Sequence, residues 1–412
     1  MKHYSWTRGM LFFAACLLIL QSGCEYNAPP SPWEESQKKE KIIPVITRVI
    51  PENNAGTASE ITLIGEHFSP VIEENNVYFN QVPAIIKSAS DTQIVVYRPN
   101  IIGDSLVIKV TVAGAVGIAR FSPYKMEAVV EDFGHFTDLE AILVCALDIE
   151  DRVYLAMGSM NVIRLNSDES RDLSFTGTTN TNLWTDMKIG SDGYLYLARH
   201  NNIIYRMALE GGSAAEYVKF ASRNDRVKCI DFDENGNLFG GGKNTGVIVV
   251  RSSTDYKKLG YYGDYEINSI RIYNGYLYVV AKYSGTKEVE INTGIWRHPI
   301  QPDGSIGDQE LVLNWSTSPY GDANLNTMTF SEKGIAYIGT NDKETPVVMY
   351  DPTTSSFKPL FFGIIPSPVD QLVWGNSTYL YAIINRNTRF DRGGQFLRIN
   401  TGELGAPYYG RQ

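Results

Sequence analysis

The residue types that most often do chemistry are few in this chain and far apart. Of its five histidines, four follow residue 23, and His67, His135, His200 and His298 are widely separated in the sequence. The motifs HExxH, CxxC, GxSxG, the phosphate-binding loop and the dinucleotide fingerprint do not occur, although metal, thiol, acyl-transfer or nucleotide chemistry commonly uses such spacings. We therefore expect no catalytic residue, no metal and no cofactor, in a protein that is not an enzyme.

Acidic residues offer one alternative to this expectation. The run Asp231–Gly236 matches the start of a calcium-binding loop, but such loops need a bidentate acid at the twelfth position, which here is Gly242. The run is therefore expected to be an ordinary turn. Four further acids precede expected strands and could converge on a central channel, as a lactonase-type metal site requires: Asp186, Asp225, Glu266 and Asp370. Solvated loop carboxylates are the more common outcome for such residues.

Aromatic and polar residues form the more promising set. Sugar rings stack on flat aromatic side chains while polar neighbours hold the hydroxyl groups, and such mixed sites are typical of ligand binding. The alternative is that these aromatic residues wedge between repeat units. The ligand-binding candidates, all in loops expected on one face, are Trp184, Arg199, His200, Tyr262, Tyr265, Trp315, Tyr320 and Arg386. Trp296 and Trp374 fall within expected strands and are assigned to the core.

A sixfold repeat must position these residues. Each copy opens on a turn such as Asp192-Gly193 or Asn274-Gly275, and an aromatic residue follows in a short apolar strand. The aromatic residues are Tyr154, Tyr196, Phe239, Tyr278, Tyr337 and Tyr381, at gaps of 42, 43, 39, 59 and 44 residues. Blades of a β-propeller recur at about 40–50 residues, and a single blade cannot bury both of its faces. The six copies imply six blades over residues 127–412, and a seventh blade built from degenerate sequence is the alternative. The motif resembles the NHL-type propeller.

The strands of this propeller can be placed from period-two alternation and turn residues. The expected first strands of the blades are Ala141–Ala146, Asp186–Ile189, Lys228–Phe232, Ser269–Ile272, Thr327–Phe330 and Gln371–Trp374. Third strands often end in arginine, as at Arg164 and Arg206, and the fourth strands are weakly marked. We expect Glu127–Phe136 to pair with the C-terminal blade and so to close the ring.

Residues 43–125 form a separate unit. About seven short strands in this stretch indicate a small immunoglobulin-like sandwich. Val49-Ile50-Pro51 before Gly56, Ile61–Gly65 before His67-Phe68, and Asn76–Asn80 resemble the IPT/TIG family. That resemblance implies a spacer or an interaction module and no chemistry. The predicted fold class is thus all-β, an IPT/TIG sandwich followed by a six-bladed β-propeller.

The first 23 residues have the parts of a lipoprotein signal peptide. Lys2 and Arg8 are positive, and the apolar run Met10–Leu20 spans only about 16 Å as a helix at ~1.5 Å per residue, too short for a bilayer. Leu20–Cys24 resembles a bacterial lipobox, although Gln21 replaces the usual small or apolar residue. The resemblance implies lipid attachment at Cys24, and simple secretion is the alternative. Residues 24–42 are expected to be a flexible tether.

Charge and cysteine content narrow the function further. The net charge is −9 with no basic block, so sequence-independent nucleic-acid binding is excluded as a function class. Cys145 and Cys229 fall on strands of different blades and are expected to be buried thiols rather than a disulfide.

The whole arrangement resembles surface lipoproteins of Gram-negative bacteria that accompany starch-utilisation-type uptake systems. The resemblance implies a protein of the outer membrane, held by its lipid at the cell surface or on the periplasmic side. Our first hypothesis is a non-catalytic binding protein for a glycan or another extracellular ligand, on the loop face of the propeller. The alternatives are a protein-interaction or adhesion scaffold in an envelope complex and, third, a propeller lyase or lactonase.

Overall fold

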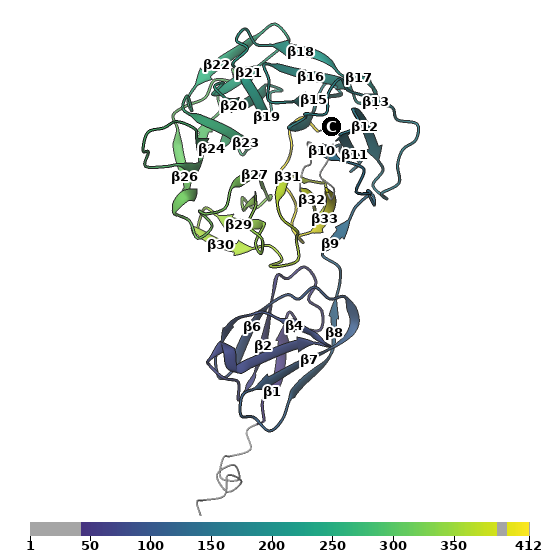
Figure 1. Cartoon of the computed structure of the whole chain (residues 1–412), viewed down its shortest axis with the longest axis vertical. Helices are drawn as coiled ribbons and strands as arrows, with labels where there is room; N and C mark the ends of the chain where they lie inside the picture. Colours follow the sequence, from purple (N-terminus) through teal and green to yellow (C-terminus); the bar gives the residue numbers. More distant parts are fainter. Residues whose placement is uncertain (1–42, 385–393, 412) are drawn as a thin grey trace, which may run out of the picture.

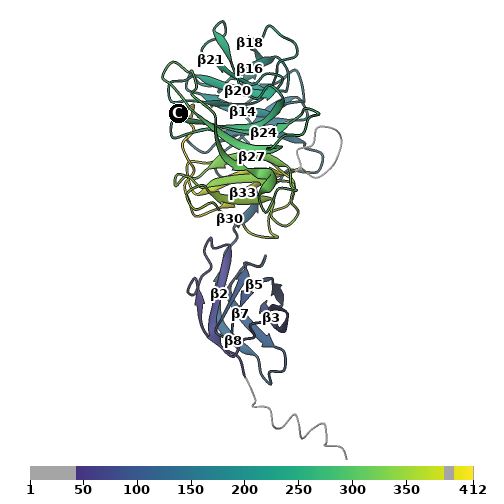
Figure 2. The ribbon, with the colours of Figure 1, turned by 90° about the vertical axis from the view of Figure 1, so that its left-hand side faces the viewer.

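The computed structural model describes residues 43–384 and 394–411. They form a small β-sandwich beside a ring of six β-sheets (Figure 1), with the sandwich lying at the edge of the ring rather than over either flat side (Figure 2). The prediction of an all-β protein with these two parts is confirmed. Within the described residues, no helix has both the length and the apolar character needed to cross a membrane.

Two four-stranded sheets make the sandwich. Buried residues alternate along the strands, as in β2, where Ile61 and Leu63 face inward against Phe79 and Ile108 of the other sheet. The strands, in sheet order, are β1 (Val45–Ile50), β2 (Glu60–Glu66), β6 (Gln93–Tyr97) and β5 (Ile86–Ala89), and then β4 (Val82–Ala84), β3 (Asn75–Phe79), β7 (Gly103–Val112) and β8 (Ala119–Met126). A 3₁₀ turn, η1 (Ile72–Glu74), precedes β3.

Six antiparallel sheets form the blades of the propeller, each with its first strand innermost (Figure 1). The first three blades are β10 (Ile142–Leu147), β11 (Val153–Met157), β12 (Asn161–Leu165) and β13 (Gly177–Thr178); β14 (Asp186–Gly190), β15 (Tyr194–Ala198), β16 (Ile203–Ala208) and β18 (Ala215–Lys219); and β19 (Arg226–Phe232), β20 (Leu238–Lys243), β21 (Val247–Val250) and β22 (Tyr256–Gly260). The short β17 (Gly212–Ser213) runs parallel to β13 and links the first two blades.

The last three blades complete the ring. They are β23 (Tyr265–Tyr273), β24 (Tyr276–Tyr283), β25 (Thr293–Pro299) and β26 (Glu310–Asn314); β27 (Leu325–Phe330), β28 (Ala336–Thr340), β29 (Val347–Asp351) and β30 (Ser356–Pro359); and β31 (Val369–Trp374), β32 (Tyr379–Ile384), β33 (Gln395–Asn400) and β9 (Val130–Asp132). A 3₁₀ turn, η2 (Trp315–Thr317), follows β26. Because β9 pairs with β33, the ring is closed by a strand from the start of the propeller segment, as predicted for Glu127–Phe136.

The repeated aromatic residue and the repeated arginine are partners. Tyr154 pairs across the sheet with Arg164, and Tyr196 with Arg206. The same pairing joins Tyr278 to Arg297 and Tyr381 to Arg398. The aromatic rings are buried between neighbouring blades, and the Tyr196 hydroxyl donates to Asp192 of the preceding turn at 2.8 Å. The motif that marks the repeat therefore holds the blades together and does not face the channel.

Candidate functional site

The site begins with an irregularity that the first strands share. In five of the six first strands the pairing register with the second strand slips by one residue. Such β-bulges redirect a side chain and are frequent beside active sites. The residues passed over by the pairing are Leu143, Lys228, Asn268, Asn326 and Asp370. Leu143 packs in the core, whereas the other four line the central cavity.

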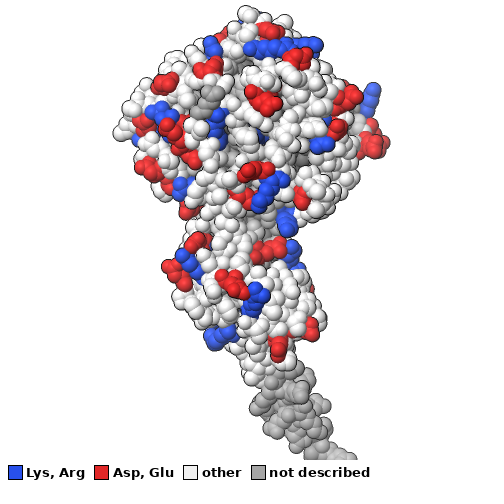
Figure 3. Space-filling model, turned by 180° about the vertical axis from the view of Figure 1, so that it is seen from behind, with Lys and Arg blue, Asp and Glu red and all other residues white. Residues whose placement is uncertain are grey.

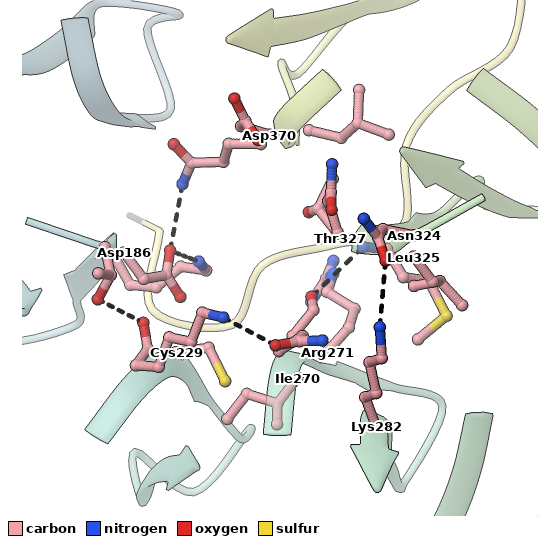
Figure 4. A pocket seen from close by; sticks show the side chains of 18 of the residues that line it. Asp186, Cys229, Ile270, Arg271, Lys282, Asn324, Leu325, Thr327 and Asp370 are labelled. Carbon is pink, nitrogen blue, oxygen red and sulfur yellow. Dashed lines mark hydrogen bonds and ion pairs between the residues drawn. The ribbon is translucent and has the colours of Figure 1, made fainter. Parts of the chain in front are cut away.

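The central cavity has a volume of about 190 Å³ and a polar lining. Asp370 and Lys282 lie on opposite sides of it (Figure 4). Asn268, Asn324, Asn326, Thr185 and Thr327 add amide and hydroxyl groups. The cavity therefore offers both hydrogen-bond donors and acceptors, in a space smaller than a typical drug-sized pocket of roughly 300–1,000 Å³.

Buried hydrogen bonds between blades fix the cavity wall. The carboxylate of Asp186 accepts from the backbone N–H of Ile230 in the next blade at 2.9 Å and from Lys188 Nζ at 2.7 Å. Gln371 Nε2 reaches the same carboxylate from the last blade at 3.1 Å, and Gln371 Oε1 accepts from the N–H of Cys145 at 2.8 Å. Removing such a buried partner leaves its neighbours unsatisfied, so these groups serve the fold of the ring.

The C-terminal tail closes one end of the channel. Ala406 donates its N–H to Phe330 O at 2.9 Å, and Arg411 donates to Trp374 O at 2.6 Å, so the tail crosses the ends of these first strands. Figure 2 shows the C-terminus on one flat side of the ring. Tyr408 reaches up from the tail and forms part of the cavity floor. The other end, where the first strands begin, is the mouth.

Arg271 anchors the tail. Its guanidinium group donates to Asp231 Oδ2 at 3.0 Å and to the carbonyls of Ile272, Ala406 and Pro407 at 2.7, 3.0 and 2.8 Å. The guanidinium carbon also lies 3.7 Å from the centre of the Tyr408 ring. The Arg271 side chain is only 1% exposed, so this end of the channel is sealed around a buried, hydrogen-bonded charge.

The reactive groups in the cavity are held in unreactive states. Burial raises the pKa of the Cys229 thiol, and the nearby Asp186 carboxylate adds to that effect, so the nucleophilic thiolate is disfavoured. Burial acts to lower the pKa of Lys188, but Asp186 and Asp231 outweigh it and raise that pKa, so the ammonium form is retained. Within residues 43–384 and 394–411, no three His, Cys, Asp or Glu side chains are grouped to hold a metal ion.

Basic residues are concentrated on one side of the mouth. Arg226 and Lys243 face each other in the β19–β20 register and are exposed, and Lys228 lies two residues further along β19. His200, in the loop between β15 and β16, donates its N–H to Val227 O at 2.8 Å and so lies against the same strand. On the opposite flat side, acidic and basic side chains are interspersed (Figure 3).

Three of the aromatic ligand-binding candidates are placed differently from the prediction. Trp184 and Trp315 are 0% exposed and Tyr262 is 6% exposed, so the expectation that they form a stacking surface is wrong. Trp184 packs edge-on against Tyr205 at 5.3 Å. Trp315 begins η2 and donates its Nε1–H to Ala323 O at 2.8 Å. Their loops fold back on the blades because this packing removes the apolar surface of each ring from water, which is favourable.

The remaining candidates are spread over the molecule. Tyr265 is half-buried and donates its hydroxyl to Ile291 O at 2.9 Å. Tyr320 stacks on Trp315, and the Arg199 guanidinium lies over Tyr205. Arg386 lies outside the described residues. The structure thus brings one predicted residue, His200, to the basic side of the mouth, and whether any of the set binds a ligand stays a prediction.

The four acids considered as metal ligands in the channel fall into two groups. Asp186 and Asp370 line the cavity, whereas Glu266 pairs with Lys228 at 3.2 Å and Asp225 pairs with Lys258 at 2.5 Å. The predicted turn at Asp231–Gly236 is confirmed, with the Asp233 carboxylate accepting backbone N–H groups inside it. His298 is buried, and its ring nitrogens lie against the Tyr262 hydroxyl and the Gly307 carbonyl.

Residues that the sequence analysis missed supply most of the polar side chains of the cavity wall. They are Lys188, Lys228, Asn268, Arg271, Lys282, Asn324, Asn326, Gln371 and Tyr408. A signal was present, because polar residues interrupt first strands that are otherwise apolar and buried. A polar residue in a strand enclosed on both faces needs a polar partner or a cavity.

The comparisons with known proteins identify one domain. Residues 44–127 match the family model of the IPT/TIG domain, so the sandwich is an IPT/TIG domain as predicted. No curated protein sequence matches the chain significantly.

Several solved structures share the outline at low similarity. An auxiliary nutrient binding protein from Bacteroides ovatus is 13% identical with a TM-score of 0.49, and one from Bacteroides thetaiotaomicron is 11% identical with a TM-score of 0.48; each match covers 87% of this chain and 97–98% of the other. A virginiamycin B lyase from Staphylococcus aureus is 10% identical with a TM-score of 0.46, covering 66% of this chain and 98% of the lyase. At this level of similarity no function transfers to this chain.

Proposed function

We propose that this protein is a non-catalytic binding protein that holds a small polar group of an extracellular ligand, a glycan in the first instance, in the central cavity of its propeller. The observation that carries the proposal is the set of bulges in the first strands. They direct Lys228, Asn268, Asn326 and Asp370 into one cavity that the tail closes at its far end. A dead-end cavity can retain a ligand.

The chemistry of the lining supports a hydroxyl-rich ligand. Each sugar hydroxyl both donates and accepts, and the cavity presents amide, ammonium and carboxylate groups side by side. The ion pairs Lys188–Asp186 and Lys228–Glu266 balance much of its charge. A cavity of about 190 Å³ has room for about six waters at ~30 Å³ each, which is the scale of one sugar ring.

The same contacts support binding rather than turnover. Asp186 is committed to hydrogen bonds that join blades, and the Cys229 thiol is buried with a raised pKa. A general acid or base needs a titratable side chain that can exchange a proton with the ligand, and neither of these two groups is available for that. We therefore propose that the bound ligand leaves unchanged.

The test is a titration of the full chain against a panel of mono- and oligosaccharides by calorimetry, with mass spectrometry of the recovered sugars. The variants Lys282→Met and Asp370→Asn should each weaken binding about tenfold, the value of one lost charge-assisted hydrogen bond. Lys257→Met, on the exposed outer strand β22, is the matched control and should bind as the wild type does. The proposal would be refuted if the whole panel failed to bind, if both cavity variants bound as tightly as the wild type, or if cleaved sugar were recovered.

We also propose that the protein acts at the cell envelope, held by a lipid on Cys24, which lies outside the described residues. The support is the lipobox-like segment Leu20–Cys24 after a short apolar run. Each buried CH₂ of an acyl chain contributes about 0.8 kcal/mol to anchoring. Metabolic labelling with a fatty-acid analogue should tag the wild type and not Cys24→Ala, and equal labelling of both would contradict the assignment.

A further inference from the structure

Like charges face each other on the basic side of the mouth. Arg226 and Lys243 are direct neighbours across the antiparallel β19–β20 pair. Both are exposed, and neither has an ion-pair partner within the described part of the chain. Opposed like charges destabilise a strand pair. Among the described residues, these two cations therefore stand together without an ion-pair partner of their own, and Glu266, whose pKa Lys243 helps to lower, is already paired with Lys228.

Further positive groups surround this pair. Lys228 projects from the bulge in β19, and the backbone N–H of Arg226 donates to Thr245 Oγ1 at 2.6 Å, which fixes the backbone at the start of this strand. The nearest acids are already engaged, since Glu266 pairs with Lys228 at 3.2 Å and Asp225 with Lys258 at 2.5 Å. The cluster keeps a net positive charge after these pairs are counted.

His200 gives an independent sign of a missing partner. Its Nε2 atom is buried and makes no hydrogen bond within the described residues. A buried ring nitrogen without a partner costs free energy. Burial lowers the pKa of His200, Glu266 opposes that effect, and Lys228, Arg226 and Lys243 reinforce it.

We infer that Arg226, Lys228, Lys243 and His200 form a subsite for an anionic group at the mouth of the channel. Its ligand is a carboxylate, sulfate or phosphate group. We assign that group to the sugar held in the cavity, and this assignment rests on the proposed function. Lys228 belongs both to this subsite and to the cavity lining, so one acidic sugar can contact the two at once. An anion here also relieves the repulsion between Arg226 and Lys243.

The experiment compares matched neutral and acidic probes on the full chain. Methyl glucoside and methyl glucuronide, methyl galactoside and methyl galacturonide, and N-acetylglucosamine and its 6-sulfate are titrated by calorimetry. We expect the acidic member of at least one pair to bind about tenfold more tightly, and this preference to vanish in the Arg226→Gln/Lys243→Gln double variant. Lys219→Gln/Lys257→Gln removes two charges from exposed positions of the outer strands β18 and β22 and should keep the preference.

Sulfate alone separates this inference from the proposed function. Millimolar sulfate should raise the melting temperature of the wild type, and do so less in the Arg226→Gln/Lys243→Gln variant. A sulfate effect of this kind with no sugar binding would refute the glycan function and keep the anion subsite. Sugars that bind without regard to charge, together with a sulfate response equal in both proteins, would overturn the subsite and keep the binding function. If no probe binds and sulfate has no differential effect, both are wrong.

Discussion

The two ends of the propeller channel use the same inner strands and treat charge in opposite ways. At the tail end, the Arg271 side chain is 1% exposed and donates to Asp231 and to three backbone carbonyls. At the mouth, Arg226 and Lys243 are exposed and face each other, and neither forms an ion pair with another described residue. At the tail end, protein groups compensate the buried cation, whereas at the mouth the exposed cations are compensated by solvent.

The difference follows from what water can reach. A buried ion must be compensated by the protein, so the groups around Arg271 are fixed once the chain folds. Exposed cations are compensated by water and salt, which a ligand can replace. The comparison therefore divides the channel into a structural floor and an exchangeable mouth, and each prediction below tests one side of that division.

The largest effect is expected at the floor. Arg271→Met removes the cation and leaves the Asp231 carboxylate buried beside Ile272 N. Loss of one partner of a buried pair typically costs about 3–5 kcal/mol, so the free energy of unfolding in urea should fall by that amount. Arg223→Met, at an exposed loop position, is the control and should change it by less than about 0.5 kcal/mol. An unchanged unfolding midpoint in Arg271→Met would show that the tail does not seal the floor.

A smaller loss is expected at Tyr408, which sits on the floor itself. Tyr408→Ala removes the ring over which Arg271 lies and the hydroxyl hydrogen bond to Thr329 at 3.0 Å. A desolvated cation–π contact contributes about 2 kcal/mol, so the free energy of unfolding should fall by roughly that amount. Tyr408→Phe keeps the ring and should recover most of the loss. If Phe and Ala destabilise equally, the hydroxyl and not the ring holds the tail.

The β-architecture of this molecule was predictable from local sequence patterns, but the residues that close the floor of the propeller channel were not. The expected first strand Gln371–Trp374 lies within the observed Val369–Trp374, because turn residues and period-two alternation act over a few residues. Arg271 was read as part of an apolar strand, Ser269–Ile272, since its partners Asp231 and Ala406 are far away in the sequence.

The residues that line the cavity were harder still to predict from the sequence, for a geometric reason. A bulge becomes visible only when two strands are paired, so the sequence could not show that Lys228 and Asn326 project into the channel. Trp184 and Trp315 precede first strands in loops that a linear reading places at the surface. Whether such a loop folds back over its ring depends on packing between blades, which a single repeat does not encode.

The pH dependence of stability should report on the mouth. Burial lowers the pKa of His200 in the folded state, and Lys228, Arg226 and Lys243 add to this against Glu266. Below about pH 6.5, the pKa of the unfolded side chain, the unfolded chain then binds more protons than the folded one. Stability from this group is therefore fully present above that pH and is lost as pH falls from there through the lower pKa of the folded state. Between pH 7.5 and 5.5, the urea midpoint of His200→Gln should fall less than that of the wild type. Equal falls would mean that the pKa of His200 is not lowered in the folded protein.

The smallest effect on stability is expected from substitution of the two exposed cations at the mouth. Arg226→Gln/Lys243→Gln removes two exposed like charges that oppose each other across β19 and β20, so it should raise the free energy of unfolding by a few tenths of a kcal/mol. Added sodium chloride screens the repulsion only in the wild type, so the gap should close as salt rises. Destabilisation of the variant by more than about 1 kcal/mol would mean that these side chains hold the fold together as Arg271 does, and the division between floor and mouth would fail.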